Sequence, residues 1–357
     1  MYANRAWWIP AEDGGTEREY FWPYINSELG LKLIYGGSQR EIQLERIRNY
    51  GHAIIFIDSS VKNFNFLRFF PKKSVIIFQM SDETYSTIST LRLLSQSAVF
   101  KVYRDYPIRS GKHIIRWPLK CFRKLISALN NNISIVLFAR ALLAGLVVAC
   151  RQLLIRCASK FLGKLFGHIP LGYTNNFDQE YRRIFSLEEN ISLVKFALNQ
   201  IESSKMVKSS HAAFFAGQRG NFDRQLMIAE ARSGKQDVER IYEKFAASDI
   251  PANQKIAVSN YVQGIMRSKF SICPPGNYSA ESFRYLESLL LQSFPLQADF
   301  VLTDPLFRNS LFPNWSEYLK SLADREIDSF EVVDLIKSEL INHKQKIDLL
   351  VLELKIG

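Results

Sequence analysis

The chain has 357 residues, of which 47% are hydrophobic and 23% are charged, and its formal net charge is +11. This composition is ordinary for a globular protein and argues against intrinsic disorder, while the length suits two domains of about 150 residues each. The four cysteines include no Cys-x-x-Cys pair and the histidines are scattered, so neither a disulfide framework nor a structural metal site is expected. Residues 1–10 lack the apolar core of a secretory signal, which predicts a cytoplasmic location.

Short apolar runs alternate with polar stretches along the first third of the chain. Strands are predicted at residues 31–37, 53–58, 74–79 and 98–103, and the pattern resumes at 168–173. Nearly continuous apolar runs of this kind, separated by roughly 20 residues, favour a parallel sheet with crossover helices.

A second series of elements follows a polar linker at residues 205–210. Strands are predicted at 212–220, 269–273 and 293–301, and helices at 221–231, 280–291 and 333–357, with a further helical stretch at 187–203 before the linker. The predicted fold is therefore α/β, with an N-terminal domain at residues 1–205 and a C-terminal domain at residues 206–357. Two such halves would bind ligands at the carboxyl ends of their strands.

One segment of the first half accounts for the whole net charge. Between Tyr106 and Phe177 there are 11 Lys and Arg residues and no Asp or Glu. The same segment is almost entirely apolar from residue 133 to 150, where Arg140 is the one charged residue. We interpret residues 107–167 as a basic, apolar helical insertion in the first domain.

Three placements of this insertion are open. It can lie on an anionic membrane surface through about residues 109–164, it can be buried as a helical hairpin, or it can span a membrane. Arg140 in the middle of the apolar run argues against a span. The scarcity of aromatic residues among the cations argues against nucleic-acid binding. An anionic membrane surface is therefore the favoured partner, which predicts a peripheral protein.

A strand that ends in a rigid turn and leads into a helix provides the main candidate site. Its candidate nucleotide-sugar-binding residues are Cys273, Pro274, Gly276, Ser282, Arg284 and Glu287. Ser282 is a candidate N-cap, and a helix N-terminus favours anions. Arg284 would present a planar fork to a diphosphate. Glu287 lies one turn later on the same helix face and could accept hydrogen bonds from ribose hydroxyls.

Residues 262–300 resemble the C-terminal signature of exostosin-like glycosyltransferases. That signature is Ser-Lys-Phe, a strand, Cys-Pro-x-Gly, Ser-x-Arg-x-x-Glu and a small-residue turn with proline, and its counterparts here are Ser268 to Phe270, Cys273 to Gly276, Ser282 to Glu287 and Ser293 to Pro295. In this chain Pro275 stands where the family often has a basic residue, and Gln292 and Ser293 stand where it usually has glycine. The resemblance implies the GT-B architecture of two facing Rossmann-like domains, inversion at the anomeric carbon, and no catalytic metal or other cofactor.

Three further candidate donor contacts lie near the start of the second domain. Gly217 and Arg219 belong to a glycine turn after a predicted strand, and Arg224 lies in the next predicted helix. The resemblance is weaker here but consistent. Arginine at either position could help to stabilise a leaving diphosphate.

The candidate catalytic base lies in the first domain. Asp82 and Glu83 follow the strand predicted at 74–79, and the resemblance also points to an acidic pair in this region. Helix N-capping by Asp82 is the structural alternative. Arg104 is a candidate contact for an anionic acceptor.

Together with the resemblance, these residues imply an inverting, metal-independent glycosyltransferase. Its donor would be a UDP- or GDP-linked sugar, and its acceptor a glycan or lipid-linked molecule in surface polysaccharide or lipopolysaccharide synthesis. The chain has no Asp-x-Asp, which argues against the metal-chelating fold of glycosyltransferases. Two alternatives stay open: a fucosyltransferase-like enzyme of the same architecture, and a non-catalytic, membrane-associated scaffold.

Overall fold

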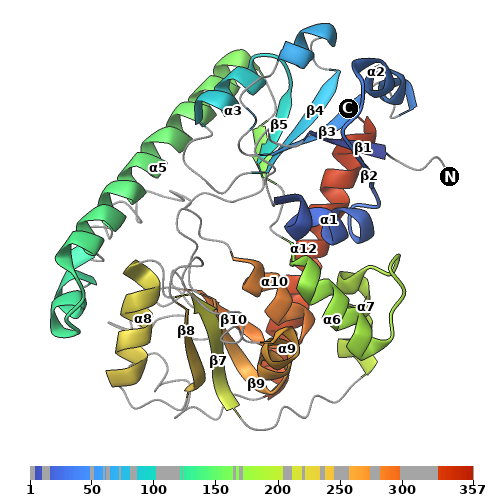
Figure 1. Ribbon diagram of the computed structural model, residues 1–357. Coiled ribbons are helices and arrows are strands. Elements are labelled where there is room, and N and C mark those ends of the chain that lie inside the picture. The colour runs from blue at the N-terminus through green and yellow to red at the C-terminus, as the bar shows by residue number, and fades with distance from the viewer. Residues whose placement is uncertain are drawn as a thin grey trace. The chain divides into compact units, whose positions relative to one another are not determined.

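The computed structural model describes residues 5–9, 17–48, 52–58, 61, 65–71, 74–80, 87–101, 121–122, 124–163, 166–168, 172–203, 211–218, 222–233, 238–244, 257–273, 282–297 and 329–356. Within these ranges the chain is α/β, and its sheets are parallel (Figure 1). The chain divides into two compact units: unit 1 comprises Met1–Asp105, Val148–Phe196 and Ile341–Gly357, and unit 2 comprises Tyr106–Val147 and Ala197–Leu340. The predicted domain boundary at residues 205 and 206 lies outside the described ranges.

Unit 1 contains a six-stranded sheet in the order β2-β1-β3-β4-β5-β6. Its strands are β1 (Arg5–Ile9), β2 (Lys32–Tyr35), β3 (Ala53–Asp58), β4 (Val75–Met80), β5 (Ala98–Lys101) and β6 (Phe166–His168). Its helices are α1 (Glu17–Ser27), α2 (Gln39–Arg48), the 3-10 helix η1 (Asn65–Phe69), α3 (Thr87–Leu94) and α6 (Asn175–Phe185). Since the chain places β2 on one side of β1 and β3 on the other, the sheet is doubly wound with a switch point between β1 and β3.

An aromatic ladder crosses one face of this sheet. Trp8, Phe56, Phe78 and Phe100 lie in register on neighbouring strands, with successive ring centroids 6.0, 4.6 and 5.3 Å apart. The same register continues to Gly167 on β6, where a Cβ would lie 2.7 Å from the Phe100 ring. Glycine at this position therefore leaves the space that Phe100 occupies, and the cross-strand pairs stabilise the order of the strands.

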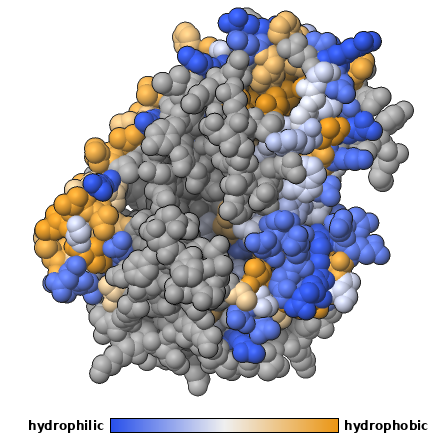
Figure 2. Space-filling view, in the orientation of Figure 1, coloured by the Kyte–Doolittle hydropathy of each residue, from blue (hydrophilic) through white to orange (hydrophobic). Residues whose placement is uncertain are grey.

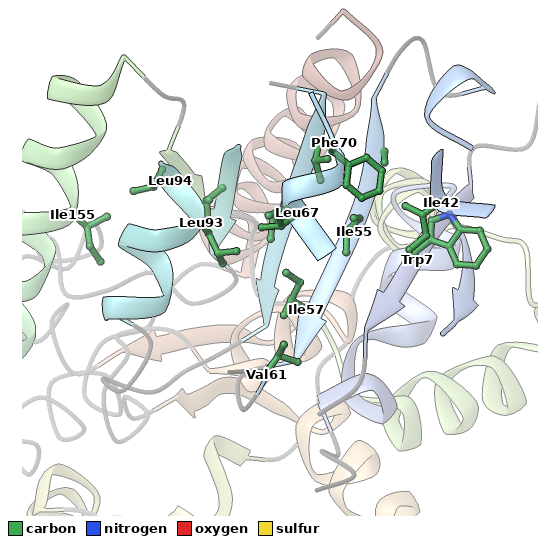
Figure 3. Packing of buried hydrophobic residues seen from close by; sticks show 14 residues of the cluster. Trp7, Ile42, Ile55, Ile57, Val61, Leu67, Phe70, Leu93, Leu94 and Ile155 are labelled. Atoms are coloured by element: carbon green, nitrogen blue, oxygen red, sulfur yellow. The ribbon is translucent and has the colours of Figure 1, made fainter. Parts of the chain in front are cut away.

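The other face of the sheet carries the aliphatic core of unit 1. Figure 3 shows Ile55 and Ile57 of β3 within a buried cluster that also takes in Leu93 and Leu94 of α3. Ile155, from a later helix, belongs to the same cluster. Both faces of the sheet are thus covered, as expected for a parallel sheet.

Strand β1 was not predicted from the sequence. Trp7 and Trp8 are 5% and 0% exposed, because β1 is an interior strand and its two neighbouring residues face the two covered sides of the sheet. The strand predicted at residues 168–173 is displaced, since β6 ends at His168 and residues 172–174 are coil before α6. Thr174 is the N-cap of α6 and accepts a hydrogen bond from the Phe177 amide, which ends any extended segment there.

Helix α12 (Ser329–Ile356) confirms the helix predicted at the C-terminal end. The residues of α12 that belong to unit 1 bury His343, Ile347 and Leu350 on one face. His343 Nε2 lies 3.0 Å from the Tyr24 hydroxyl of α1, and Tyr24 is fully buried. Burial, with a smaller contribution from Lys346, lowers the pKa of His343 to about 3, so the imidazole is neutral and can accept the tyrosine hydrogen bond.

Unit 2 contains a four-stranded sheet in the order β10-β9-β7-β8. Its strands are β7 (His211–Gln218), β8 (Val238–Lys244), β9 (Ser268–Cys273) and β10 (Phe294–Gln297), and its helices include α8 (Phe222–Ser233), α9 (Val258–Met266) and α10 (Phe283–Leu290). Helix α9 packs against β7 and β9, and α10 packs against β9 and β10 (Figure 1). The first strand again lies between the second and the third, so the switch point is between β7 and β9.

The predicted basic insertion contains helix α5 (Ile135–Leu162). A helical stretch at residues 124–130 precedes it, and a turn closed by a 2.8 Å hydrogen bond from the Ile133 amide to the Ala128 carbonyl connects the two. Since β5 and β6 pair in parallel, α5 lies in the crossover between them. In the part of the chain that the structure describes, no helix combines the length and the apolar character needed to cross a membrane.

The C-terminal end of α10 has a residue other than glycine in the left-handed conformation. Gln292 has φ of 59°, its amide bonds to the Leu289 carbonyl at 3.0 Å, and the Ser293 amide bonds to the Ser288 carbonyl at 2.8 Å. This is a Schellman motif, in which the left-handed residue is usually glycine. The backbone here therefore favours glycine, and Gln292 adopts the left-handed conformation with strain.

Replacing Gln292 with glycine is expected to raise the free energy of unfolding by about 0.5 to 1 kcal/mol, because the left-handed strain exceeds the extra entropy of the unfolded chain. Urea unfolding of the two proteins measures the difference. Gln292→Ala is the matched control, since it removes the side chain without easing the backbone, and it should give no gain. Equal stabilisation by both variants would contradict the explanation.

Candidate functional site

Strands of the unit 2 sheet that carry or precede described candidate donor residues end at its switch point. Strands β7 and β9 are parallel neighbours, so Gln218 and Cys273 end them at the same edge. The chain continues from β7 towards β8 and from β9 towards β10, on opposite sides of the switch point. Doubly wound sheets bind ligands at this place, outside the carboxyl ends of the strands.

Arg284 is anchored at this edge of the sheet. It lies in the first turn of α10, and its Nε donates a 2.8 Å hydrogen bond to the carbonyl of Ala216 in β7. Its guanidinium also lies 5.5 Å from the ring centroid of Phe215. These two contacts fix the plane of the guanidinium, and the Nη groups are then the donors that an anion would use.

A second guanidinium is close to the first. Arg224 lies in the first turn of α8, the helix that follows β7, and it is half-buried. Burial and the positive charge of Arg284 lower the pKa of Arg224 to about 10. An anion bound to both guanidiniums would relieve the repulsion between them, and a diphosphate is an anion of suitable charge.

Ser282 lies at the N-terminus of α10, beside these cations. It has extended N-cap geometry, but its side chain makes no capping hydrogen bond. Its Oγ is buried and has no hydrogen-bond partner among the described residues. A buried hydroxyl at a helix N-terminus is well suited to donate to a phosphate oxygen.

Glu287 has a buried partner that the sequence did not indicate. Glu287 is 2% exposed, and its Oε2 accepts a 2.7 Å hydrogen bond from the Tyr261 hydroxyl of α9. Burial, followed by the negative charge of Glu287, raises the pKa of Tyr261 well above its usual value, so the hydroxyl is a stable donor. Gly264 lets α9 approach the sheet, because a Cβ there would clash with the Phe214 ring.

The Cys273 side chain belongs to the core. It is 1% exposed, and its thiol lies 3.5 Å from the Ser271 carbonyl and 3.8 Å from the Ser288 hydroxyl. Burial raises the pKa of Cys273 to about 12, so the thiol stays neutral. Any contact of Cys273 with a ligand would therefore be through its main chain.

The described residues of the predicted donor site are Gly217, Arg224, Cys273, Ser282, Arg284 and Glu287. Arg284 interacts electrostatically with Arg224 and with Cys273, but the side chains of Cys273 and Glu287 are buried, so the predicted contact of Glu287 with a ribose stays a prediction. The remaining candidates, Asp82, Glu83, Arg104, Arg219, Pro274 and Gly276, lie outside the described residues. The sequence did not identify Tyr261 as a site residue, because its position on the buried face of α9 is the one feature that the sequence shows for it. Over the described ranges, no three His, Cys, Asp or Glu side chains are grouped to hold a metal ion.

Comparison with models of known protein families gives no match, and neither does a search of curated protein sequences.

The Tyr261–Glu287 contact can be tested by a double-mutant cycle. Tyr261→Phe is expected to lower the free energy of unfolding by about 1.5 to 3 kcal/mol, because a buried carboxylate loses a hydrogen bond. Tyr261→Phe and Glu287→Leu, which removes the acceptor, should be non-additive, with a coupling energy of about 1 to 3 kcal/mol in urea unfolding. Additive effects would show that the two side chains do not interact in the folded protein.

Proposed function

We propose that this chain is an inverting glycosyltransferase that binds the diphosphate of a nucleotide sugar at Arg284, Arg224 and Ser282. The observation that carries the proposal is Arg284 at the N-terminus of α10, held on the Ala216 carbonyl of β7, together with Arg224, whose pKa the charge of Arg284 lowers. Doubly wound sheets place nucleotides at such a switch point. The resemblance of residues 262–300 to exostosin-like glycosyltransferases agrees with this placement.

The proposed architecture is GT-B, with the donor on unit 2 and the acceptor on unit 1. Both sheets are doubly wound, with the second and third strands on opposite sides of the first, which supports two Rossmann-like domains. The acceptor would be a glycan or a lipid-linked sugar, and Arg104 would contact its anionic groups.

The chemical step follows from these roles. The acceptor hydroxyl oxygen attacks the anomeric carbon as the bond from that carbon to the diphosphate oxygen breaks, so the configuration inverts. The hydroxyl proton passes to Asp82 or Glu83 as general base. The negative charge that develops on the leaving diphosphate is stabilised by Arg284, Arg224 and the N-terminus of α10, so the step requires no metal ion.

A nucleotide-sugar panel tests this function. The purified chain is incubated with UDP- and GDP-linked sugars in the presence of EDTA, and release of the nucleoside diphosphate is measured with candidate acceptors. We expect turnover of one donor class, and a loss of at least about 100-fold in either Asp82→Asn or Glu83→Gln. Asp348→Asn, an exposed aspartate of α12, is the matched control and should keep full activity.

Three outcomes would contradict parts of the proposal. Unchanged turnover in both carboxylate variants would exclude them as the base. Turnover that depends on added divalent metal would exclude the metal-independent step. Nucleotide binding without turnover of any donor would favour the non-catalytic scaffold.

A further inference from the structure

The outer face of α5 is apolar along the length of the helix. Exposed fractions are 64% for Leu143, 62% for Leu153 and 91% for Phe161. Five more aliphatic residues are exposed on this helix: Ile135, Val136, Leu146, Leu154 and Leu162. At about 100° per residue, all of these side chains except that of Leu162 fall within a sector of about 100°. Figure 2 shows hydrophobic residues gathered over α5.

The folded core does not require this outer face, because α5 has a separate inner face. Leu137, Phe138 and Ala141 pack against Phe222 and Leu226 of α8 in unit 2. Further along the helix, Ile155 packs in the aliphatic core of unit 1. A surface helix normally presents polar side chains on the side opposite its buried stripe. Helix α5 presents aliphatic and aromatic residues instead.

Cations border the outer face on both sides. Arg140 and Arg151 are 11 positions apart, so they share one border, and Arg156 and Lys160 are four positions apart, so they share the other. The nearest acidic residues in the sequence are Asp105 and Asp178. An apolar stripe flanked only by basic residues complements an interface of acyl chains and anionic headgroups.

We propose that the outer face of α5 is a docking surface for an anionic lipid interface, in which the helix lies parallel to the membrane plane. Phe122, Ile126 and Leu129 precede α5 at intervals of four and three residues, and they are exposed as well. A second copy of the chain is a poor candidate to cover this face through its own α5, because two equally basic surfaces would repel each other. This inference does not depend on the proposed enzymatic function.

Sedimentation with lipid vesicles tests the proposal on the full chain. Vesicles of phosphatidylcholine alone are compared with vesicles of phosphatidylcholine and phosphatidylglycerol. We expect at least about tenfold tighter binding to the anionic vesicles, weakened by salt. The triple variant Leu143→Glu, Leu153→Glu, Phe161→Glu should lose at least about tenfold in affinity for them.

A matched control uses exposed residues of unit 1 that lie outside α5. The triple variant Leu44→Glu, Leu349→Glu, Phe69→Glu makes the same substitutions at similarly exposed positions outside α5. The control variant changes the net charge by the same amount but leaves the outer face of α5 intact. It should therefore bind anionic vesicles more tightly than the α5 variant does. Equal binding by the two variants would overturn the proposal, as would wild-type binding that ignores the anionic lipid.

A fluorescent probe distinguishes contact of this face from binding elsewhere, and it stays informative if a glutamate variant fails to fold. Cys157 is exposed, and it lies on α5 within the apolar sector. A polarity-sensitive fluorophore on Cys157, in a Cys121→Ser, Cys150→Ser background, should shift to the blue when anionic vesicles are added. An unchanged spectrum with bound protein would overturn the proposal. So would a dimer in light scattering that the α5 triple variant abolishes, since a second copy would then cover the face.

Discussion

Arg284→Ala is expected to weaken binding of the cognate nucleoside diphosphate by about 10- to 100-fold, because a charged, oriented hydrogen-bond donor to phosphate contributes about 1.5 to 3 kcal/mol. The anchoring of Nε on the Ala216 carbonyl holds the fork at the edge of the sheet before any ligand arrives. Arg284→Lys keeps the charge but loses the fork and its anchor, so its affinity should fall between those of the other two proteins.

Isothermal titration of the purified chain with UDP and GDP, without added metal, measures these affinities. Arg267→Ala is the matched control, because it removes an exposed arginine at the end of α9 in the same unit. It should leave the affinity within about twofold of wild type, since an exposed charge away from the site acts weakly. Equal losses in the Arg267 and Arg284 variants would mean that net charge, and not the site, governs binding.

The second large effect is a loss of stability in mild acid that depends on His343. Folding lowers the pKa of His343 from 6.5 to about 3, so between these values the unfolded chain binds a proton that the folded chain excludes. Above pH 6.5 neither state binds this proton, and His343 does not lower the free energy of unfolding. As the pH falls from 6.5 towards 3, the free energy of unfolding decreases by about 1.4 kcal/mol per pH unit. Protonation would also remove the acceptor for the Tyr24 hydroxyl.

Urea unfolding of wild type and His343→Gln at a series of pH values isolates this contribution. Glutamine does not titrate, so the difference between the two free energies of unfolding should change by about 2 kcal/mol between pH 7 and pH 5. A difference that stays constant over this range would show that His343 titrates as it does in the unfolded chain.

The sequence predicted the candidate site more completely than its surroundings. The helix that carries Arg284 and Glu287 was predicted at residues 280–291, and α10 confirms it, while the role of these residues and of Ser282 in donor binding stays a prediction. The Tyr261–Glu287 hydrogen bond joins residues of two helices, and no local pattern encodes it. The meaning of Gln292 likewise emerged only from its backbone angle, since the sequence shows a departure from glycine but not the strain.

The fold was predictable where apolar runs are long and bounded by turns. Strands β3 and β4 are continuous buried segments, and both were expected within a residue or two of their bounds. Strand β1 is short and follows few preceding residues, and its place between β2 and β3 depends on pairing with segments about 25 to 50 residues later in the chain. Because β5 and β6 are parallel neighbours in the six-stranded sheet, α5 must connect them as a crossover helix. The charge pattern of residues 107–167 did not indicate this connection.

The most direct test of the central claim is a crystal structure of the chain with its cognate nucleoside diphosphate and no added metal. We predict that the diphosphate lies at the carboxyl ends of β7 and β9, with its oxygens about 3 Å from the Arg284 guanidinium and the Ser282 hydroxyl. A nucleotide bound elsewhere, or one whose diphosphate points away from Arg284 and α10, would contradict the assignment of this site and the glycosyltransferase mechanism built on it.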